Sequence, residues 1–209
     1  MLISTPVALP KVEVSDWPKF WSVWNIHGRE LTKVRASPNA TSGKHFGFDI
    51  LRVPGFFPTY AAPLCNLDVY MPELYRSIIN VLPLSTRCVR LVESRGDFPA
   101  HYDNFVAAWS LRCMLYCADP KPQWYYTPLD STSQTFLRLP EQTNWWAYRD
   151  GAVKHGTMYN PKYPKILIQV FGDFSVTKKL VDGSAPLFEH EYKIHLDETT
   201  NELSCLPRS

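Results

Sequence analysis

The chain has 209 residues, which is long enough for a single domain with its own hydrophobic core. Its 22 basic and 20 acidic residues nearly balance and form no Lys/Arg-rich run, so general nucleic-acid binding is not expected. The first residues lack the basic start and apolar stretch of a signal peptide, and no run of about 18 apolar residues could span a membrane, so a cytoplasmic protein is expected.

Helices are predicted in the amino-terminal part of the chain. Asp16-Trp17-Pro18 is typical of a helix start with Asp as N-cap, and Trp17, Trp21 and Trp24 then share one face of the helix. Residues 72–79 (PELYRSII) indicate a second, short helix with proline in its first turn.

From residue 86 the apolar pattern changes to a period of two, which is typical of strands. Strands are predicted over residues 86–93, 108–118, 144–148, 165–171 and 190–196, with residues 119–134 as a loop or lid. Arg95-Gly96-Asp97 is interpreted as a turn and not as an integrin ligand, because the chain shows no secretion signal.

The order of these elements predicts a mainly β fold, a small antiparallel barrel or jelly roll with helices buttressing one side. We expect a single domain over residues 1–209: a helical and loop support region (1–85), a core (86–174) and a carboxy-terminal extension (175–209). The five cysteines, an odd number without a CxxC pair, are interpreted as reduced thiols.

Two separated sites carry possible chemistry, His101-Tyr102-Asp103 and His155. Two imidazoles and one carboxylate are the ligand set of the non-haem Fe(II) facial triad. On an extended segment His101 and Asp103 project to the same side, and a second His from a distant strand can close the triangle. Three coordination positions then stay open, as oxygen chemistry requires. Taken singly, each His also fits an ordinary core or surface position.

Two cations lie in apolar segments, Lys165 at the start of KILIQVF and Arg112 inside AWSLRCMLYCA. A buried cation without an anion is costly. Alternation places Arg112 and Tyr116 on one strand face. Several interpretations stay open at this point. The Lys165 ammonium could lie in solvent, and Lys162 could be the cation that binds an anion instead. Arg112 could pair with a bound ligand or with an internal carboxylate.

Three segments, FPAHYDN, SLRCMLYCAD and WWAYRDGAVKHGTMYNPKYPKILIQVFG, resemble the core of the Fe(II)/2-oxoglutarate-dependent oxygenases. The HxD motif, the strand after it and the lysine ten residues past the distal His are similar to the prolyl 4-hydroxylase branch. TRCVRLVESRGDFPAHYDN and the Leu-Arg pair resemble the aspartyl/asparaginyl hydroxylase-like proteins. The resemblance covers residues 86 to 174 and implies a double-stranded β-helix (jelly-roll, cupin-like) core.

The resemblance implies that His101, Asp103 and His155 bind Fe(II) and act as the catalytic centre. Lys165 would bind the distal carboxylate of 2-oxoglutarate, with Arg112 and Tyr116 as further co-substrate ligands. The presence of Asp103 favours hydroxylation over halogenation, since halogenating members carry a small residue at this position.

The chain departs from the prolyl hydroxylase pattern at DPKPQWYYTPLD, which replaces a glycine-rich segment. Trp124, Tyr125 and Tyr126 there fit either a substrate mouth or packing over the barrel end. Trp145 and Trp146 point to opposite faces of their strand, so one is expected in the core and only the other could face a cavity. Proline or aspartate is therefore not carried over as the target.

The leading hypothesis is a dioxygenase that uses O2 to hydroxylate an amino acid, a peptidyl residue or another small molecule, with release of succinate and CO2. Two alternatives are a cupin-like metalloenzyme that works without 2-oxoglutarate and a ligand-binding or structural jelly roll without oxygenase activity. Nucleic-acid demethylation is disfavoured by the near-neutral charge.

Overall fold

The structure is a computed structural model. It describes the backbone of residues 4–6, 9–33, 44–56, 60–82, 86–96, 98–101, 109–118, 124–128, 135–136, 144–149, 153–157, 162, 164–172, 192–196 and 203–207. Side chains are described over residues 9–31, 44–56, 60–82, 86–96, 111–118, 144–147, 162 and 164–172.

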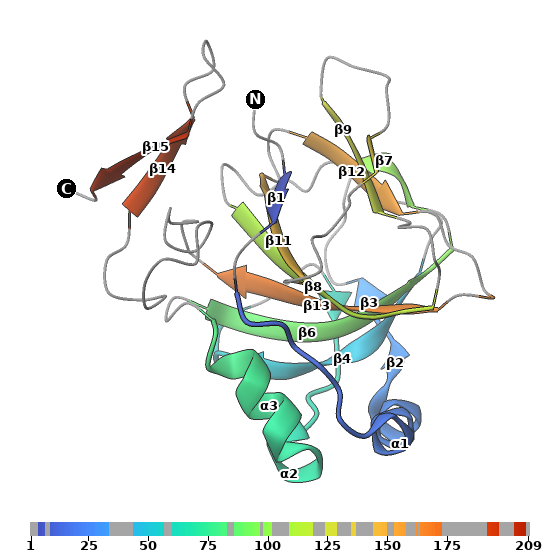
Figure 1. Cartoon of the computed structure of the whole chain (residues 1–209). Coiled ribbons are helices and arrows are strands. Elements are labelled where there is room, and N and C mark those ends of the chain that lie inside the picture. Colours follow the sequence, from blue (N-terminus) through green and yellow to red (C-terminus); the bar gives the residue numbers. More distant parts are fainter. Residues whose placement is uncertain are drawn as a thin grey trace.

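Two antiparallel sheets dominate the described part of the chain (Figure 1). The larger sheet has the order β1-β11-β8-β13-β6-β4-β2, with the bounds β1 Ser4–Pro6, β11 Trp145–Arg149, β8 Trp109–Cys117, β13 Lys165–Gly172, β6 Thr86–Arg95, β4 Lys44–Arg52 and β2 Arg29–Glu30. The smaller sheet has the order β10-β9-β12-β7, with the bounds β10 Thr135–Phe136, β9 Trp124–Pro128, β12 Val153–Thr157 and β7 Phe98–His101. Two short pairs complete the strands: β3 (Thr32–Lys33) with β5 (Tyr60–Ala61), and β14 (Tyr192–Leu196) with β15 (Leu203–Pro207).

From β6 onward the chain passes back and forth between the two sheets. Strands β6, β8, β11 and β13 belong to the larger sheet, and β7, β9, β10 and β12, which alternate with them in sequence, belong to the smaller one. As a result, neighbours within a sheet are distant in sequence: β13 lies between β6 and β8. Figure 1 shows β7, β9 and β12 on the side of the larger sheet opposite the helices.

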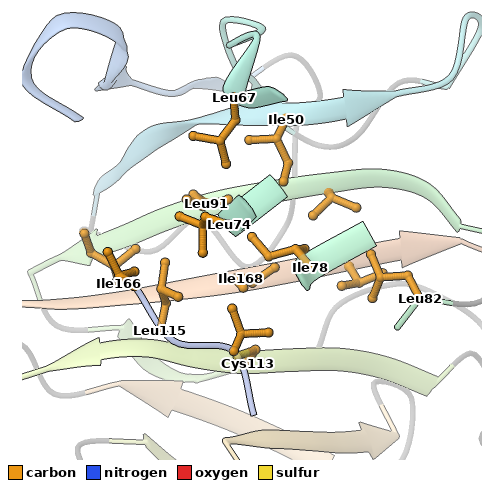
Figure 2. Packing of buried hydrophobic residues seen from close by; sticks show 14 of the residues in the cluster. Ile50, Leu67, Leu74, Ile78, Leu82, Leu91, Cys113, Leu115, Ile166 and Ile168 are labelled. Carbon is orange, nitrogen blue, oxygen red and sulfur yellow. The ribbon is translucent and has the colours of Figure 1, made fainter. Parts of the chain in front are cut away.

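The helices cover one face of the larger sheet and form the main hydrophobic core there. They are α1 (Trp17–His27), α2 (Leu67–Tyr70) and α3 (Pro72–Ile79). Asp16 caps α1 by accepting a hydrogen bond from the Lys19 backbone N–H at 2.9 Å. Figure 2 shows Leu74 and Ile78 of α3 directed at Leu91 and Ile168 of the sheet, all four of them buried. Burial of this apolar face fixes the larger sheet on its helical support.

A smaller apolar cluster lies on the other face of the larger sheet. Its buried members are Leu31, Ala62, Val92, Trp146 and Leu167, with Tyr60 and Met114 packed against them. We call this face, which looks toward the smaller sheet, the inner face. Because Ile166, Ile168 and Val170 of β13 belong to the helix-side core, alternation assigns the intervening β13 residues to the inner face.

The prediction of a mainly β chain with amino-terminal helices is confirmed, and both predicted helices and the five predicted strands are present within one or two residues. Two segments differ from the prediction. Residues 1–85 contain a nine-residue strand, β4, which pairs with β6. Residues 124–128, predicted as loop or lid, form β9 of the smaller sheet. The division of residues 1–209 into support, core and extension stays a prediction.

Candidate active site

Two histidines that are far apart in sequence become neighbours in the smaller sheet. β12 lies between β7 and β9, and the backbone of His155 is the direct partner of His101 on β7 and of Tyr126 on β9. The register of β12 against β7 shifts just after this pair, between His155 and Thr157. Asp103 lies outside the described residues, as do the side chains of both histidines. The register thus brings together the two histidine positions that the sequence singled out.

The lysine at the start of β13 is buried. Lys165 is only 2% exposed, whereas Lys162, three residues earlier, is exposed. Alternation with Ile166 puts Lys165 on the inner face, together with Leu167 of the smaller cluster. Of the two lysines weighed from the sequence, Lys165 is therefore the one that lies inside the protein.

Polar and charged residues form a cross-strand row on the same inner face. The register aligns one residue from each of five neighbouring strands: Asp49 (β4), Arg90 (β6), Gln169 (β13), Arg112 (β8) and Trp146 (β11). Asp49, Arg90, Arg112 and Trp146 are all at most 2% exposed. The row crosses nearly the whole width of the larger sheet.

Asp49 holds the β4 end of this row by ion pairs. It accepts hydrogen bonds from Arg90 through Nε at 2.7 Å and Nη2 at 3.3 Å, and from Nη1 of the half-buried Arg52 at 3.3 Å. Arg90 Nη2 also donates to the Tyr60 carbonyl at 2.8 Å. Burial raises the pKa of the nearby Cys88 thiol to about 12, and the Asp49 carboxylate adds to the shift.

Phe171 lies between the two arginines of the row. The Arg90 guanidinium carbon is 5.8 Å from the centre of the Phe171 ring, and that of Arg112 is 5.4 Å from it. Both distances are within the range of cation–π attraction. Arg112 Nη1 also donates to the Leu111 carbonyl at 3.1 Å. The Arg112 side chain therefore extends toward the Phe171 end of β13.

Tyr116 does not share the face of Arg112, and the predicted alternation is wrong at this point. Its ring packs edge-on against Trp17 at 4.9 Å and Trp21 at 5.1 Å between centroids, on the helix side of the sheet. The pairing of β8 with β13 shifts between Ile166 and Leu167, so one extra residue of β8 reverses the faces that follow. The structure does not bring Tyr116 together with Arg112 and Lys165.

The two adjacent tryptophans are both fully buried, on opposite faces of β11. Trp145 belongs to the helix-side core, and its indole N–H donates to the Pro10 carbonyl at 3.0 Å. Trp146 belongs to the smaller cluster on the inner face. The predicted division between the two faces is confirmed, and Trp146 is the tryptophan on the side of the smaller sheet. Of Trp124, Tyr125 and Tyr126 only the backbone is described.

Asp49, Arg90 and Gln169 are polar residues of the inner-face row that the sequence interpretation missed. Arg90 stands between Val89 and Leu91 in an apolar strand, which is the same signal that singled out Arg112. Among the side chains that the structure describes, no three His, Cys, Asp or Glu residues are grouped so as to hold a metal ion. No described helix has the length and apolar character to cross a membrane.

Comparisons with known proteins were made by sequence and by structure. No protein-family model matches the chain, and no curated protein matches it by sequence. Several solved structures are similar at low identity, and three of them are described here. An oxidoreductase of the 2OG-Fe(II) oxygenase family from Burkholderia pseudomallei has a TM-score of 0.43 and 10% identity, covering 74% of this chain and 78% of its own.

The second is a prolyl hydroxylase from Trichoplax adhaerens, in complex with a peptide fragment of the oxygen degradation domain of hypoxia inducible factor. It has a TM-score of 0.41 and 9% identity, covering 80% of this chain and 79% of its own. The third, the Fe(II)/α-ketoglutarate-dependent dioxygenase TqaL, has a TM-score of 0.35 and 11% identity, covering 82% and 80%. These descriptions name the class of protein that the sequence motifs resemble, and the proposal below rests on this chain's own residues.

Proposed function

We propose that this chain is a non-haem Fe(II)/2-oxoglutarate-dependent dioxygenase that hydroxylates an amino acid, a peptidyl residue or another small molecule. The observation that carries the proposal is the direct backbone pairing of His155 with His101, in a sheet that lies on the side of the larger sheet opposite the helices (Figure 1), the side to which alternation assigns the buried Lys165. The alternation of consecutive strands between the two sheets supports the further proposal of a double-stranded β-helix.

The residues present fit the metal that the proposal requires. Residues directly opposite one another on antiparallel strands have Cβ atoms about 4.5–5.5 Å apart. That spacing suits two imidazoles that bind one ion, and the pairing of His101 with His155 meets it at the level of the backbone. Asp103, two residues after His101, would supply the carboxylate, so that His101, Asp103 and His155 would hold Fe(II).

Lys165 fits the distal carboxylate of 2-oxoglutarate. An ammonium at 2% exposure needs an environment of anions or acceptors, and a dicarboxylate supplies an anion of full charge. The apolar cluster around Trp146 and Leu167 on the same face would exclude water from the bound co-substrate and strengthen that ion pair. Bound Fe(II) and 2-oxoglutarate supply the oxidant for a C–H bond, with O2 consumed and succinate and CO2 released.

The proposal is tested by anaerobic titration of the protein with Fe(II) and 2-oxoglutarate, with the visible charge-transfer absorption of the metal-bound keto acid as the readout. We expect the absorption in the wild type and its loss in His155→Ala. His27→Ala is the matched control, because His27 ends α1 on the helix side of the larger sheet, and this variant should keep the absorption.

A second readout is succinate formed from 2-oxoglutarate in air, which needs no knowledge of the substrate. Absence of both signals in a folded wild type would contradict the proposal and favour a ligand-binding or structural jelly roll. Metal binding without a response to 2-oxoglutarate would favour the cupin-like alternative.

The four described cysteines 65, 88, 113 and 117 are free thiols, which agrees with the proposed cytoplasmic location.

A further inference from the structure

Ser94 and Lys165 lie at the point where β6 and β13 part. The two strands pair directly at Val92 and Leu167, and this is their last pair toward the Lys165 end. β6 nevertheless stays paired with β4 as far as Arg95, and β13 is paired with β8 from Lys165 onward. Ser94 comes two residues after Val92 on β6. Lys165 comes two residues before Leu167 on β13, so that Ser94 and Lys165 face each other where the two strands diverge.

Both residues are buried on the inner face. Ser94 is 4% exposed and Lys165 is 2% exposed. Val92 and Leu167 belong to the smaller cluster, and alternation puts the residues two positions away on the same side of the sheet. Directly opposed residues of paired strands have Cβ atoms about 4.5–5.5 Å apart. A carboxylate group bound between the two parting strands is therefore within reach of both the Ser94 hydroxyl and the Lys165 ammonium.

Arg112 occupies a different part of the inner face. Its partner on β13 is Gln169, four residues from Lys165, which at ~3.3 Å per strand residue is about 13 Å along the strand. Its guanidinium lies 5.4 Å from the ring of Phe171, further along β13 in the same direction. Across β13 from Arg112, toward β6, it is Ser94 that lies level with Lys165.

His45 holds the Ser94 hydroxyl from the neighbouring strand β4. The two residues are direct backbone partners, and His45 Nδ1 lies 3.1 Å from Ser94 Oγ. The imidazole ring meets the ring of Tyr60 edge-on, at 5.0 Å between centroids. Tyr60 is held in turn, because its ring packs against the smaller cluster and its carbonyl accepts a hydrogen bond from Arg90 Nη2 at 2.8 Å. These contacts fix the position of Nδ1 relative to the hydroxyl.

We propose that Ser94 binds the distal carboxylate of 2-oxoglutarate together with Lys165, and that His45 is the positioning residue that directs the Ser94 hydroxyl at it. This rests on the proposed function, which assigns Lys165 to the co-substrate. A hydroxyl has one hydrogen to donate and two lone pairs to accept with. With the His45 Nδ1–H donating to Ser94 Oγ, the Ser94 O–H donates to the carboxylate, and consecutive hydrogen bonds of this kind strengthen one another.

The amino-terminal region thereby takes part in co-substrate binding. His45 stands on β4, outside residues 86–174, for which the core was predicted from the sequence. Through His45, residues 1–85 supply the positioning of a co-substrate ligand in addition to their apolar packing under the sheet.

The experiment compares 2-oxoglutarate with 2-oxopentanoate, which lacks the distal carboxylate, by calorimetric titration of the full chain with Zn(II) as a redox-inert ion. We expect Ser94→Ala to bind 2-oxoglutarate about tenfold more weakly than the wild type, since the bond is made to a charged group, and to bind 2-oxopentanoate equally well. His45→Phe should show the same selective loss, because it keeps a ring against Tyr60 but has no nitrogen. His45→Asn should bind like the wild type, because its amide nitrogen can take the place of Nδ1.

A double variant separates positioning from a structural role. If His45 acts through Ser94, His45→Phe should cause no further loss of 2-oxoglutarate affinity in the Ser94→Ala background. A general effect on the fold would instead weaken the binding of both keto acids. Ser77→Ala is the matched control: the Ser77 hydroxyl also makes one hydrogen bond, to the Leu74 carbonyl at 2.8 Å, but within α3, and this variant should bind both keto acids as the wild type does. If His45→Phe does not fold, His45→Leu takes its place.

Four outcomes would overturn the inference while the proposed function stands. They are an unchanged 2-oxoglutarate affinity in Ser94→Ala, an unchanged affinity in His45→Phe, additive losses in the double variant, and a loss in His45→Asn as large as that in His45→Phe. A wild type that binds metal but no 2-oxoglutarate would overturn the proposed function, and the roles of Ser94 and His45 would fall with it.

Discussion

Asp49 and Arg90 form an ion pair in the interior of the protein, with Arg90 Nε 2.7 Å from Asp49 Oδ1 and neither side chain more than 2% exposed. The pair joins β4, which the sequence did not reveal, to β6, the first strand of the predicted core. It also fixes the segment at Tyr60, whose carbonyl accepts a hydrogen bond from Arg90. The amino-terminal region and the core are thus connected through charge as well as through apolar packing.

Asp49→Asn should lower the free energy of unfolding by about 3–5 kcal/mol, because it leaves the Arg90 guanidinium buried without its counter-charge. Urea denaturation followed by tryptophan fluorescence measures the change. Arg52→Gln is the control: Arg52 contacts the same carboxylate but is partly exposed, so its loss should cost about 1 kcal/mol or less. Equal costs in the two variants would show that the Asp49–Arg90 pair is energetically unimportant.

Lys165→Met should weaken 2-oxoglutarate binding about 10- to 100-fold, since a hydrogen-bonded charge pair contributes ~1.5–3 kcal/mol. Calorimetric titration with 2-oxoglutarate and with 2-oxopentanoate, which lacks the distal carboxylate, measures this. The wild type should prefer the dicarboxylate, and Lys165→Met should not distinguish the two. Lys162→Met, at an exposed position, is expected to behave as the wild type. A larger loss of 2-oxoglutarate affinity in Lys162→Met than in Lys165→Met would contradict the assignment of Lys165 to the distal carboxylate.

Tyr116→Leu should destabilise the protein without affecting the co-substrate. The substitution removes two edge-on ring contacts to α1, which together are worth about 1–3 kcal/mol. Thermal unfolding should record the loss, while the affinity for 2-oxoglutarate should equal that of the wild type. A selective loss of 2-oxoglutarate binding at unchanged stability would instead restore the role first expected from the sequence.

The buried thiols predict a loss of stability in alkali. Burial raises the pKa of Cys88 from 9.0 to about 12 and that of Cys65 from 9.0 to about 11. The unfolded chain therefore loses these protons first, so their contribution to stability is complete below pH 9 and is lost as the pH rises through the folded values. Denaturation of the wild type and of Cys88→Ala between about pH 8 and about pH 9.5, a range in which the thiols of the unfolded chain but few lysines titrate, measures the difference. Cys88→Ala should show a shallower decline, and parallel curves would refute the prediction.

Local sequence signals predicted most of the fold where the pattern was regular. The N-cap at Asp16 and the apolar run after Lys165 correspond to α1 and β13 as observed. β4 was missed although Phe46, Phe48 and Ile50 alternate with Gly47 and Asp49, because this short pattern is interrupted where Leu51 follows Ile50 at a register shift. In β8 the alternation held up to Met114 and then failed for Tyr116, because a register shift leaves no trace in the residues themselves.

The candidate site, like the fold, was predicted from the sequence only in part. His101, His155 and Lys165 stood out because their residue types are unusual in their surroundings, and that information is local. Their spatial relation depends on how strands more than fifty residues apart pair, which only the fold decides. The separation of Arg112 from Lys165 depends on the direction of a side chain toward Phe171, and this too was invisible in the sequence.

The pairing of β1 with β11 has a consequence for folding during synthesis on the ribosome. Ser4 pairs with Tyr148, and the following segment is attached by two hydrogen bonds between Val12 and the Asn144 side chain, at 3.1 and 2.8 Å. About 140 residues must be synthesised before these partners exist. At 5–20 residues per second this takes roughly 7–30 s, during which Leu9 and Val12 remain without the core that later buries them. Substitutions at Leu9 or Val12 that change the free energy of unfolding only slightly should therefore still lower the yield of folded protein during synthesis.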